Sequence, residues 1–215
     1  KKKINKKIND VLNSNSYILG NEVRQFENRF SKYLGLKYAV GVSNGTDALI
    51  LSLKAVNIKK GDEVITTSHT AYATIAAIVE AGAKPVFVDI KEDDFNMNSA
   101  ELKKKITKKT RAIIIVHLYG NPADIVEISK VAKKNKVYLI EDCSQAHGAE
   151  FNKKKVGTFG DLSCFSFYPT KNLSTFGDAG IVCTNNKKMF KKVKFFREYG
   201  WKKKILVFRK DTIKD

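Results

Sequence analysis

The chain has 215 residues and 43% of them are hydrophobic, so it can bury a sizeable core as one domain, or as one domain and a fragment. It contains no run of about eighteen apolar residues and no apolar signal segment, so we expect no membrane span and a cytoplasmic location. The formal net charge of +18 could indicate nucleic-acid binding, but the lysines are dispersed in pairs and triplets without a basic stripe or finger motif, which favours solvated surface.

The first elements expected along the chain are a helix, a strand and a second helix. At 22–34 apolar side chains recur at three- and four-residue steps, which predicts one face of an amphipathic helix. Residues 38–42 are predicted to form a short strand. The turn at 43–47 then opens a second helical pattern that runs through Val56 and stops by Gly61. The unit is therefore a strand, a glycine turn and a helix.

Strands and helices continue to alternate along the rest of the chain. Beyond residue 142 the strands become shorter, and the loops are rich in Gly, Ser, Thr and Pro. Alternation of this kind predicts an α/β protein with three layers, α/β/α, in which helices cover both faces of a mostly parallel central sheet. We expect strands at 63–67, 85–89, 112–117, 137–141, 162–167 and 180–184, and helices at 71–81, 99–106 and 125–135.

These patterns divide the chain into three segments. Residues 1–36 form an N-terminal helical segment, and 37–202 form the large domain. Residues 203–215 form an atypical end that carries no caps or turn signals. We therefore expect the chain to stop within a fold.

Gly45 and Thr46 lie where a predicted strand turns into a helix. The first amides of a helix are free, and glycine lets an anion approach them closely, so this turn suits a phosphate. The alternative is a plain tight turn in which Thr46 or Asp47 caps the helix. The turn alone does not distinguish the two.

Two later residues add chemistry to this turn. Asp142 follows an apolar strand, so its carboxylate should emerge at the C-terminal edge of the sheet, where it can hold a cationic ring nitrogen. Lys171 lies among apolar and hydroxyl residues, unlike the clustered lysines elsewhere, although a plain loop lysine is the alternative. A phosphate cradle, a strand-end carboxylate and an isolated lysine together match how proteins hold pyridoxal phosphate.

The three cysteines carry little chemical signal. Cys143, Cys164 and Cys183 form no CxxC pair and stand at no metal-ligand spacing from the histidines. We expect reduced, mostly buried thiols and no metal site.

Five motifs make the sequence recognisable, and they lie at 17–23, 43–49, 141–148, 166–173 and 177–180. With these motifs the chain resembles the DegT/StrS family of sugar aminotransferases from residue 13 to about 202. The resemblance implies a pyridoxal-phosphate enzyme of fold type I, in which 37–202 is the cofactor-binding large domain and the small C-terminal domain is missing. It also implies that full-length chains pair as homodimers with sites at the interface.

The resemblance implies roles for particular residues. Lys171 is the Schiff-base lysine and carries the proton of the 1,3-shift, while Asp142 pairs with the pyridinium nitrogen. Gln145 lies near the ring hydroxyl, and His147 supports its loop. The phosphate contacts come from Gly45, Thr46 and Ser166.

One position departs from the family pattern. Where many relatives place an aromatic residue to stack on the cofactor ring, this chain has Ala71, followed by Tyr72. Tyr72 either replaces that residue as a cofactor-binding side chain or packs within its helix, since one helical step turns a side chain by roughly 100°. Both interpretations stay open.

The segments at 117–124 and 197–201 look most like family members that aminate the 3-keto carbon of dTDP-linked 6-deoxy sugars. The implied function is transamination of such a nucleotide-linked keto-sugar with glutamate as amino donor, in deoxyamino-sugar or surface-polysaccharide biosynthesis. We expect a truncated copy, so an inactive or non-catalytic fragment is the main alternative. Weaker alternatives are a nucleic-acid-binding regulator and a sugar dehydratase, which would carry histidine in place of Lys171.

Overall fold

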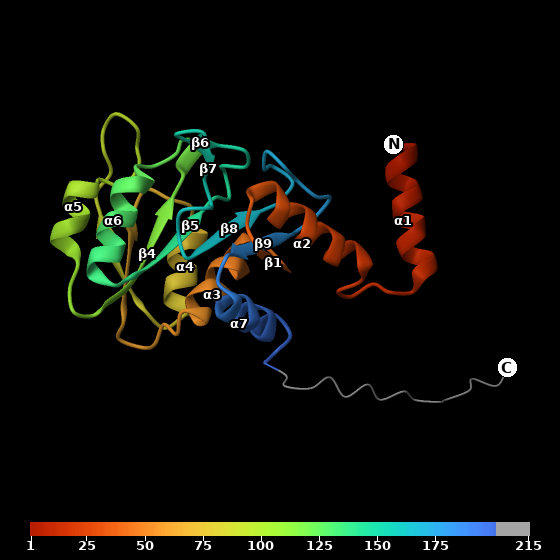
Figure 1. The fold of residues 1–215 in the computed structure, drawn as a ribbon, viewed down its shortest axis with the longest axis horizontal. Helices are drawn as coiled ribbons and strands as arrows, with labels where there is room; N and C mark the ends of the chain where they lie inside the picture. The colour runs from red at the N-terminus through yellow and green to blue at the C-terminus, as the bar shows by residue number, and fades with distance from the viewer. Residues whose placement is uncertain (201–215) are drawn as a thin grey trace.

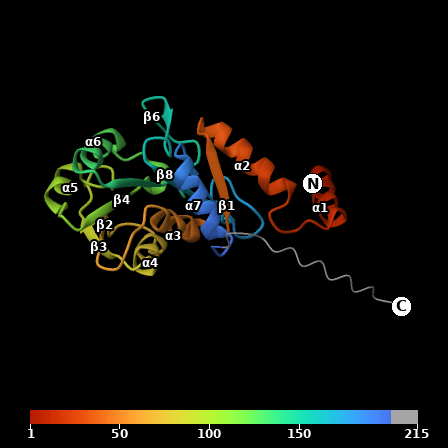
Figure 2. The same cartoon turned by 60° about the horizontal axis from the view of Figure 1, so that its bottom comes forward.

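The computed structural model describes residues 1–200, so Trp201, Lys202 and the end predicted at 203–215 lie outside the described residues. A central sheet and a small hairpin, β6 (Glu150–Phe151) with β7 (Lys154–Lys155), make up the β structure. The sheet is built from β1 (Tyr38–Val42), β2 (Glu63–Thr67), β3 (Lys84–Val88), β4 (Thr110–Val116), β5 (Tyr138–Asp142), β8 (Leu162–Ser166) and β9 (Gly180–Thr184). Their order across the sheet is β1-β9-β8-β5-β4-β2-β3, with the strands from β1 to β4 labelled in Figure 1 and β2 and β3 labelled in Figure 2.

Most neighbouring strands of this sheet run parallel. β2 pairs in parallel with β3 and β4, and parallel pairing continues through β5 to β8. β9 differs, because it runs antiparallel to both β8 and β1. The prediction of a mostly parallel sheet is therefore confirmed.

Helices cover both faces of the sheet, which confirms the three-layer prediction. The cluster of buried residues on one face includes side chains of α3, α4 and α7, and the clusters on the other face include those of α2, α5 and α6. The expected helix and strand ends shift by only one or two residues. The helices are α1 (Lys2–Ser14), α2 (Asn21–Leu34), α3 (Gly45–Ala55), α4 (Tyr72–Glu80), α5 (Ser99–Lys105), α6 (Ile125–Asn135) and α7 (Lys187–Arg197).

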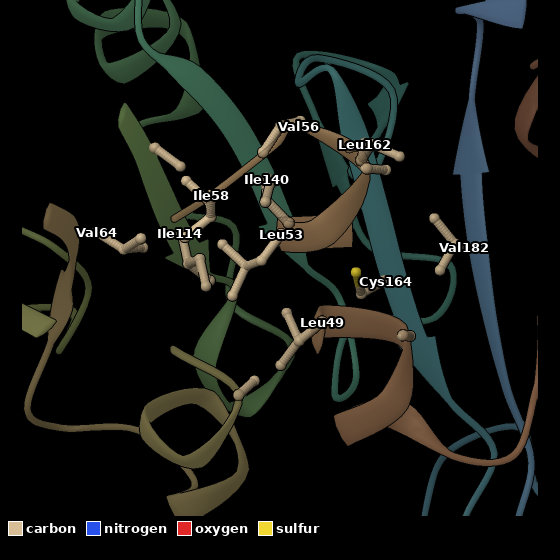
Figure 3. Close-up of a cluster of buried hydrophobic side chains, with 14 of the residues drawn as sticks. Leu49, Leu53, Val56, Ile58, Val64, Ile114, Ile140, Leu162, Cys164 and Val182 are labelled. Carbon is tan, nitrogen blue, oxygen red and sulfur yellow. The ribbon is translucent and has the colours of Figure 1, made fainter. Parts of the chain in front are cut away.

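The core shows the alternation expected of strands buried on both faces. Ile114 of β4 belongs to the cluster that includes α3, whereas Ile113 and Ile115 belong to the opposite cluster. Leu49 and Leu53 of α3 extend into the cluster that contains Ile114 (Figure 3). Burying each of these leucines contributes about 1.5–3 kcal/mol. This packing fixes α3 on the sheet, and with it the position of its N-terminus.

The two N-terminal helices differ in how they pack. Phe30 of α2 makes edge-on contacts with Phe165 and Phe167, at ring-centroid distances of 5.0 and 5.4 Å. α1 has no buried residue and lies beyond α2, away from the sheet, in both ribbon views (Figure 1 and Figure 2). Within residues 1–200, none of the helices combines the length and apolar character that crossing a bilayer requires. The division of the chain at residue 36 stays a prediction.

Candidate active site

The carboxyl ends of β1, β4, β5 and β8 meet at one edge of the sheet, because these strands point the same way. Asp142 is the last residue of β5, and Ser166 is the last residue of β8. Gly180 begins β9 at the same edge, where a Cβ would lie 2.2 Å from the Asn44 carbonyl oxygen. Segments that are distant in the sequence therefore approach one another closely here.

A pocket of about 340 Å³ opens at this edge. Tyr72 does not line it. The other predicted site residues all do, namely Gly45, Thr46, Asp142, Gln145, Ser166 and Lys171. Further lining residues that the sequence did not single out include Thr70, Ser144, Tyr168 and Asp178.

The N-terminus of α3 forms one wall of the pocket. Asn44 caps this helix by accepting the Asp47 N–H at 2.7 Å, so the alternative prediction of a cap by Thr46 or Asp47 is wrong. A Cβ on Gly45 would lie 2.8 Å from the Cβ of Ser166, so only glycine fits without movement. The first amides of the helix, at Gly45 and Thr46, have no acceptor within the helix and suit an anion.

Asp142 supplies a buried carboxylate, which suits a cation where the amides of α3 suit an anion. The residue is 4% exposed, and its Oδ1 accepts the Ser144 N–H at 3.1 Å. Its Oδ2 accepts the hydroxyl of Thr74 at 3.2 Å. Burying a carboxylate is costly unless it is paired and hydrogen-bonded, so a cationic group in the pocket would complete its surroundings.

Lys171 lies on the loop between β8 and β9, and hydrogen bonds close the base of that loop. The Phe167 N–H donates to the Ala179 carbonyl at 2.8 Å, and the Thr175 hydroxyl donates to the Phe167 carbonyl at 3.0 Å. Among residues 1–200, the side-chain amine of Lys171 makes no hydrogen bond or ion pair. The loop therefore brings an unengaged amine to the pocket wall.

Gln145 is held in one orientation. Its Oε1 accepts the Tyr119 N–H at 2.7 Å, which leaves the amide NH₂ as a donor. Tyr119 has a left-handed φ of 57°, a conformation that a non-glycine residue rarely adopts. The backbone at Tyr119 thus sets which end of the Gln145 amide is available.

The structure does not bring Tyr72 to the other site residues. Its side chain is 85% exposed, so the alternative that it packs within its helix is wrong. Ala71, by contrast, lines the pocket at the position where the sequence lacks an aromatic residue. A cofactor contact by Tyr72 stays a prediction.

His147 packs beside the pocket. Its ring lies 5.5 Å from the ring of Phe165 and 5.3 Å from that of Phe167. Burial lowers the pKa of His147 from its usual 6.5, and the charge of Lys171 adds to this effect, while the backbone of Ser166 partly opposes it. Contact with two core rings is consistent with the supporting role predicted for His147.

A buried network that sequence reasoning missed lies beneath the site. His117 Nε2 and Glu141 Oε2 are 3.1 Å apart, and Glu141 Oε2 also accepts the Gly157 N–H at 2.7 Å. His117 Nδ1 accepts the Ala123 N–H at 3.1 Å, so Nε2 carries the proton and donates to Glu141. Because Glu141 directly precedes Asp142, the network fixes the end of β5.

The cysteines are buried, as expected. Burial raises the pKa of all three thiols, those of Cys143, Cys164 and Cys183. The atoms of Cys143, His117 and Glu141 that could bind a metal ion lie within 4.8 Å of one another. The His117 and Glu141 side chains, however, are already hydrogen-bonded to each other and to backbone amides.

Taken together, the pocket offers three complementary groups. The helix amides suit an anion, the buried carboxylate suits a cationic ring nitrogen, and the amine suits a carbonyl carbon. The absence of a side chain at Gly45 keeps the backbone of α3 close to Ser166 and bare toward the pocket. A phosphorylated pyridine aldehyde carries a partner for each of these groups.

Comparison with known proteins agrees with this chemistry. Residues 1–212 match the DegT/DnrJ/EryC1/StrS aminotransferase family. The dTDP-3-amino-3,6-dideoxy-alpha-D-galactopyranose transaminase of Aneurinibacillus thermoaerophilus is 47% identical over 203 residues, which are 94% of this chain and 56% of that protein. The chain spans about half the length of the curated relatives it matches.

Solved structures show the same likeness. DesV of S. venezuelae, in complex with a ketimine intermediate, is 41% identical with a TM-score of 0.89, over 92% of this chain and 53% of that one. The E. coli GDP-4-keto-6-deoxy-D-mannose-3-dehydratase with bound hydrated PLP is 34% identical with a TM-score of 0.85, over 91% and 52%. Because the family match covers almost the whole sequence, the chain belongs to the DegT/DnrJ/EryC1/StrS aminotransferase family.

Proposed function

We propose that the chain is the cofactor-binding part of a pyridoxal-phosphate aminotransferase that acts on a nucleotide-linked keto-sugar. The observation that carries the proposal is that Asp142 and Lys171 line one pocket at the N-terminus of α3. The name of the A. thermoaerophilus relative, a dTDP-sugar transaminase, supports the substrate class. We assign a dTDP-3-keto-6-deoxyhexose as the substrate and glutamate as the amino donor.

When bound, pyridoxal phosphate supplies an electron sink for the carbanion that amino transfer requires. Asp142 would hold the ring nitrogen by a charge-assisted hydrogen bond. The Nζ of Lys171 would hold the cofactor and, once the amine of the donor has displaced it, the freed Nζ would move the proton during the transfer. Gln145 would donate its amide NH₂ toward the ring hydroxyl. The amides of Gly45 and Thr46 and the hydroxyl of Ser166 would hold the phosphate.

We propose that a second copy of the chain covers the loop that carries Lys171. This loop exposes large apolar side chains beside the pocket, with Phe176 86% exposed and Leu173 50% exposed. Exposed apolar side chains at a functional edge are typical of an interaction surface. Light scattering should report a homodimer, and Phe176→Ser should shift the equilibrium toward monomer.

Two alternatives keep the fold and change the chemistry. A dehydratase is among the similar structures. The family resemblance implies that such an enzyme carries histidine at the position of Lys171, which argues against this alternative. A non-catalytic fragment is the other alternative, because the chain spans about half the length of its relatives. Stoichiometric cofactor uptake separates the aminotransferase and the dehydratase from the non-catalytic fragment. Amino transfer to a keto-sugar then separates the aminotransferase from the dehydratase.

The first experiment is an absorbance titration of the chain with pyridoxal phosphate. We expect a new absorbance band at a longer wavelength than that of the free cofactor. After borohydride treatment, we expect a permanent mass increase on the peptide that contains Lys171. Lys171→Ala should abolish both signals, whereas Lys153→Ala, on the β6–β7 hairpin, should keep them. Labelling spread over many lysines without the band would contradict the proposed site.

A second experiment tests the role of the carboxylate. Asp142→Asn should still bind the cofactor, with lower affinity, but should suppress amino transfer, since a neutral amide cannot hold the charge of the pyridinium nitrogen. Single-turnover conversion of glutamate, followed by absorbance, measures the loss. Unchanged conversion in Asp142→Asn would remove Asp142 from the mechanism.

A further inference from the structure

Thr74 is a buried hydroxyl with one specific partner in the site. It lies in the first turn of α4 and is fully buried. Its Oγ1 is 3.2 Å from Asp142 Oδ2 and 2.9 Å from the Oγ1 of Thr70. Thr70 itself lines the pocket. The two hydroxyls and the carboxylate therefore form a short chain from the pocket wall to Asp142.

The direction of this chain is fixed by counting protons. A threonine hydroxyl has one hydrogen, and an ionised carboxylate can only accept. Thr74 must therefore donate to Asp142, and Thr70 must donate to Thr74. A hydroxyl that accepts one hydrogen bond becomes a stronger donor in the next, so Thr70 strengthens the contact that Thr74 makes.

Two separate elements hold the two oxygens of Asp142. Oδ2 is held from α4 by Thr74, and Oδ1 is held by the Ser144 N–H in the turn after β5. The helix position of Thr74 is itself set by packing, since Ala77 and Ile78 of α4 lie in the core against the sheet. The carboxylate thus has a fixed orientation before any ligand enters.

We propose that Thr74 is a positioning residue that acts through Asp142. It orients the carboxylate, so that the carboxylate binds the cationic ring nitrogen of the cofactor. The inference rests on the proposed function, because it requires pyridoxal phosphate in the pocket. It assigns a role to a residue that does not itself touch the cofactor.

The test measures cofactor affinity by absorbance or equilibrium dialysis in the 215-residue chain. Thr74→Val keeps the shape of the side chain but removes the donor, and Thr74→Ser keeps the donor. We expect Thr74→Val to weaken pyridoxal phosphate binding about tenfold, the scale of one hydrogen bond to a charged group, and Thr74→Ser to weaken it far less.

A second ligand separates positioning from a general structural effect. An analogue of pyridoxal phosphate with carbon in place of the ring nitrogen has nothing to offer Asp142. If Thr74 acts through Asp142, then Thr74→Val should not change the affinity for this analogue. Thr74→Val should also have no further effect in the Asp142→Asn background.

Each outcome has a distinct meaning. An equal loss of affinity for both ligands, or an equal loss in Thr74→Val and Thr74→Ser, would show a structural role and overturn the inference. No uptake of either ligand by the unaltered chain would overturn the proposed function and this inference with it. If Thr74→Val does not fold by circular dichroism, Thr70→Val takes its place, with a smaller loss expected for pyridoxal phosphate and none for the analogue.

Discussion

Arg197 and Glu27 form an ion pair that also hydrogen-bonds the backbone N–H and the carbonyl of Gly41. Arg197 Nη1 lies 2.6 Å from Glu27 Oε1, which also accepts the Gly41 N–H at 2.8 Å. Arg197 Nη1 in turn donates to the Gly41 carbonyl at 3.2 Å. The pair therefore joins α2, β1 and α7 directly before the turn into α3.

Removing one partner of this pair should destabilise the fold. The two side chains are only 11% and 17% exposed, so Arg197→Met would leave the Glu27 carboxylate unpaired in a partly buried place. We expect the free energy of unfolding to fall by about 2 kcal/mol in urea titrations. Lys7→Met, which removes the exposed pair with Asp10, should change it by less than about 0.5 kcal/mol. Equal losses in the two variants would contradict the argument.

Gly45→Ala should damage both packing and the anion site. The added methyl would lie 2.8 Å from the Cβ of Ser166 and 3.2 Å from the Oγ of Ser144, so the backbone of α3 must move. We expect a loss of about 1–3 kcal/mol in stability and weaker binding of pyridoxal phosphate. Gly177→Ala is the matched control, because a Cβ there meets nothing within 4 Å. Retained affinity in Gly45→Ala would argue against a phosphate at this helix end.

Glu141→Gln should be strongly destabilising although it changes the size of the side chain little. Both carboxylate oxygens accept hydrogen bonds, Oε1 from the N–H groups of Phe159 and Gly160 and Oε2 from Gly157 and His117. An amide NH₂ at either position would face a donor, at a cost of about 2–4 kcal/mol. Thermal unfolding measures it, with the exposed Glu150→Gln as control. Similar melting temperatures for the two variants would be the contrary result.

His147 should contribute a pH dependence to stability. Burial lowers its folded pKa below the usual 6.5, so the folded state binds the proton less well than the unfolded state. The contribution of neutral His147 to the free energy of unfolding is therefore fully present above about pH 6.5. It is lost as the pH falls from there through the folded pKa. Urea unfolding at several pH values between 5 and 8 gives the free energy of unfolding as a function of pH. Below pH 6.5 this free energy should change less steeply with pH in His147→Gln than in the unaltered chain, by at most about 1.4 kcal/mol per pH unit. Parallel curves for the two proteins would refute this assignment.

The sequence by itself predicted the fold class, because hydrophobic periodicity and glycine turns are local signals. The alternation of strand and helix patterns indicated a mostly parallel sheet, and the strand that ends at Asp142 placed a carboxylate at its carboxyl edge. Lys171 stood out from the many other lysines through its neighbours. Gly45, Thr46, Asp142 and Lys171 could be named on these grounds, and the family resemblance added Gln145 and Ser166 to the pocket lining.

Only the tertiary structure decided how distant groups meet. The contact of Thr74 with Asp142 depends on how α4 packs on the sheet, and the pairing of His117 with Glu141 depends on the register of β4 against β5. The exposure of Tyr72 and the cap at Asn44 likewise follow from the path of the backbone. Spacing along a chain determines which face of an element a residue occupies, but the approach of two elements is set by packing between residues far apart in sequence.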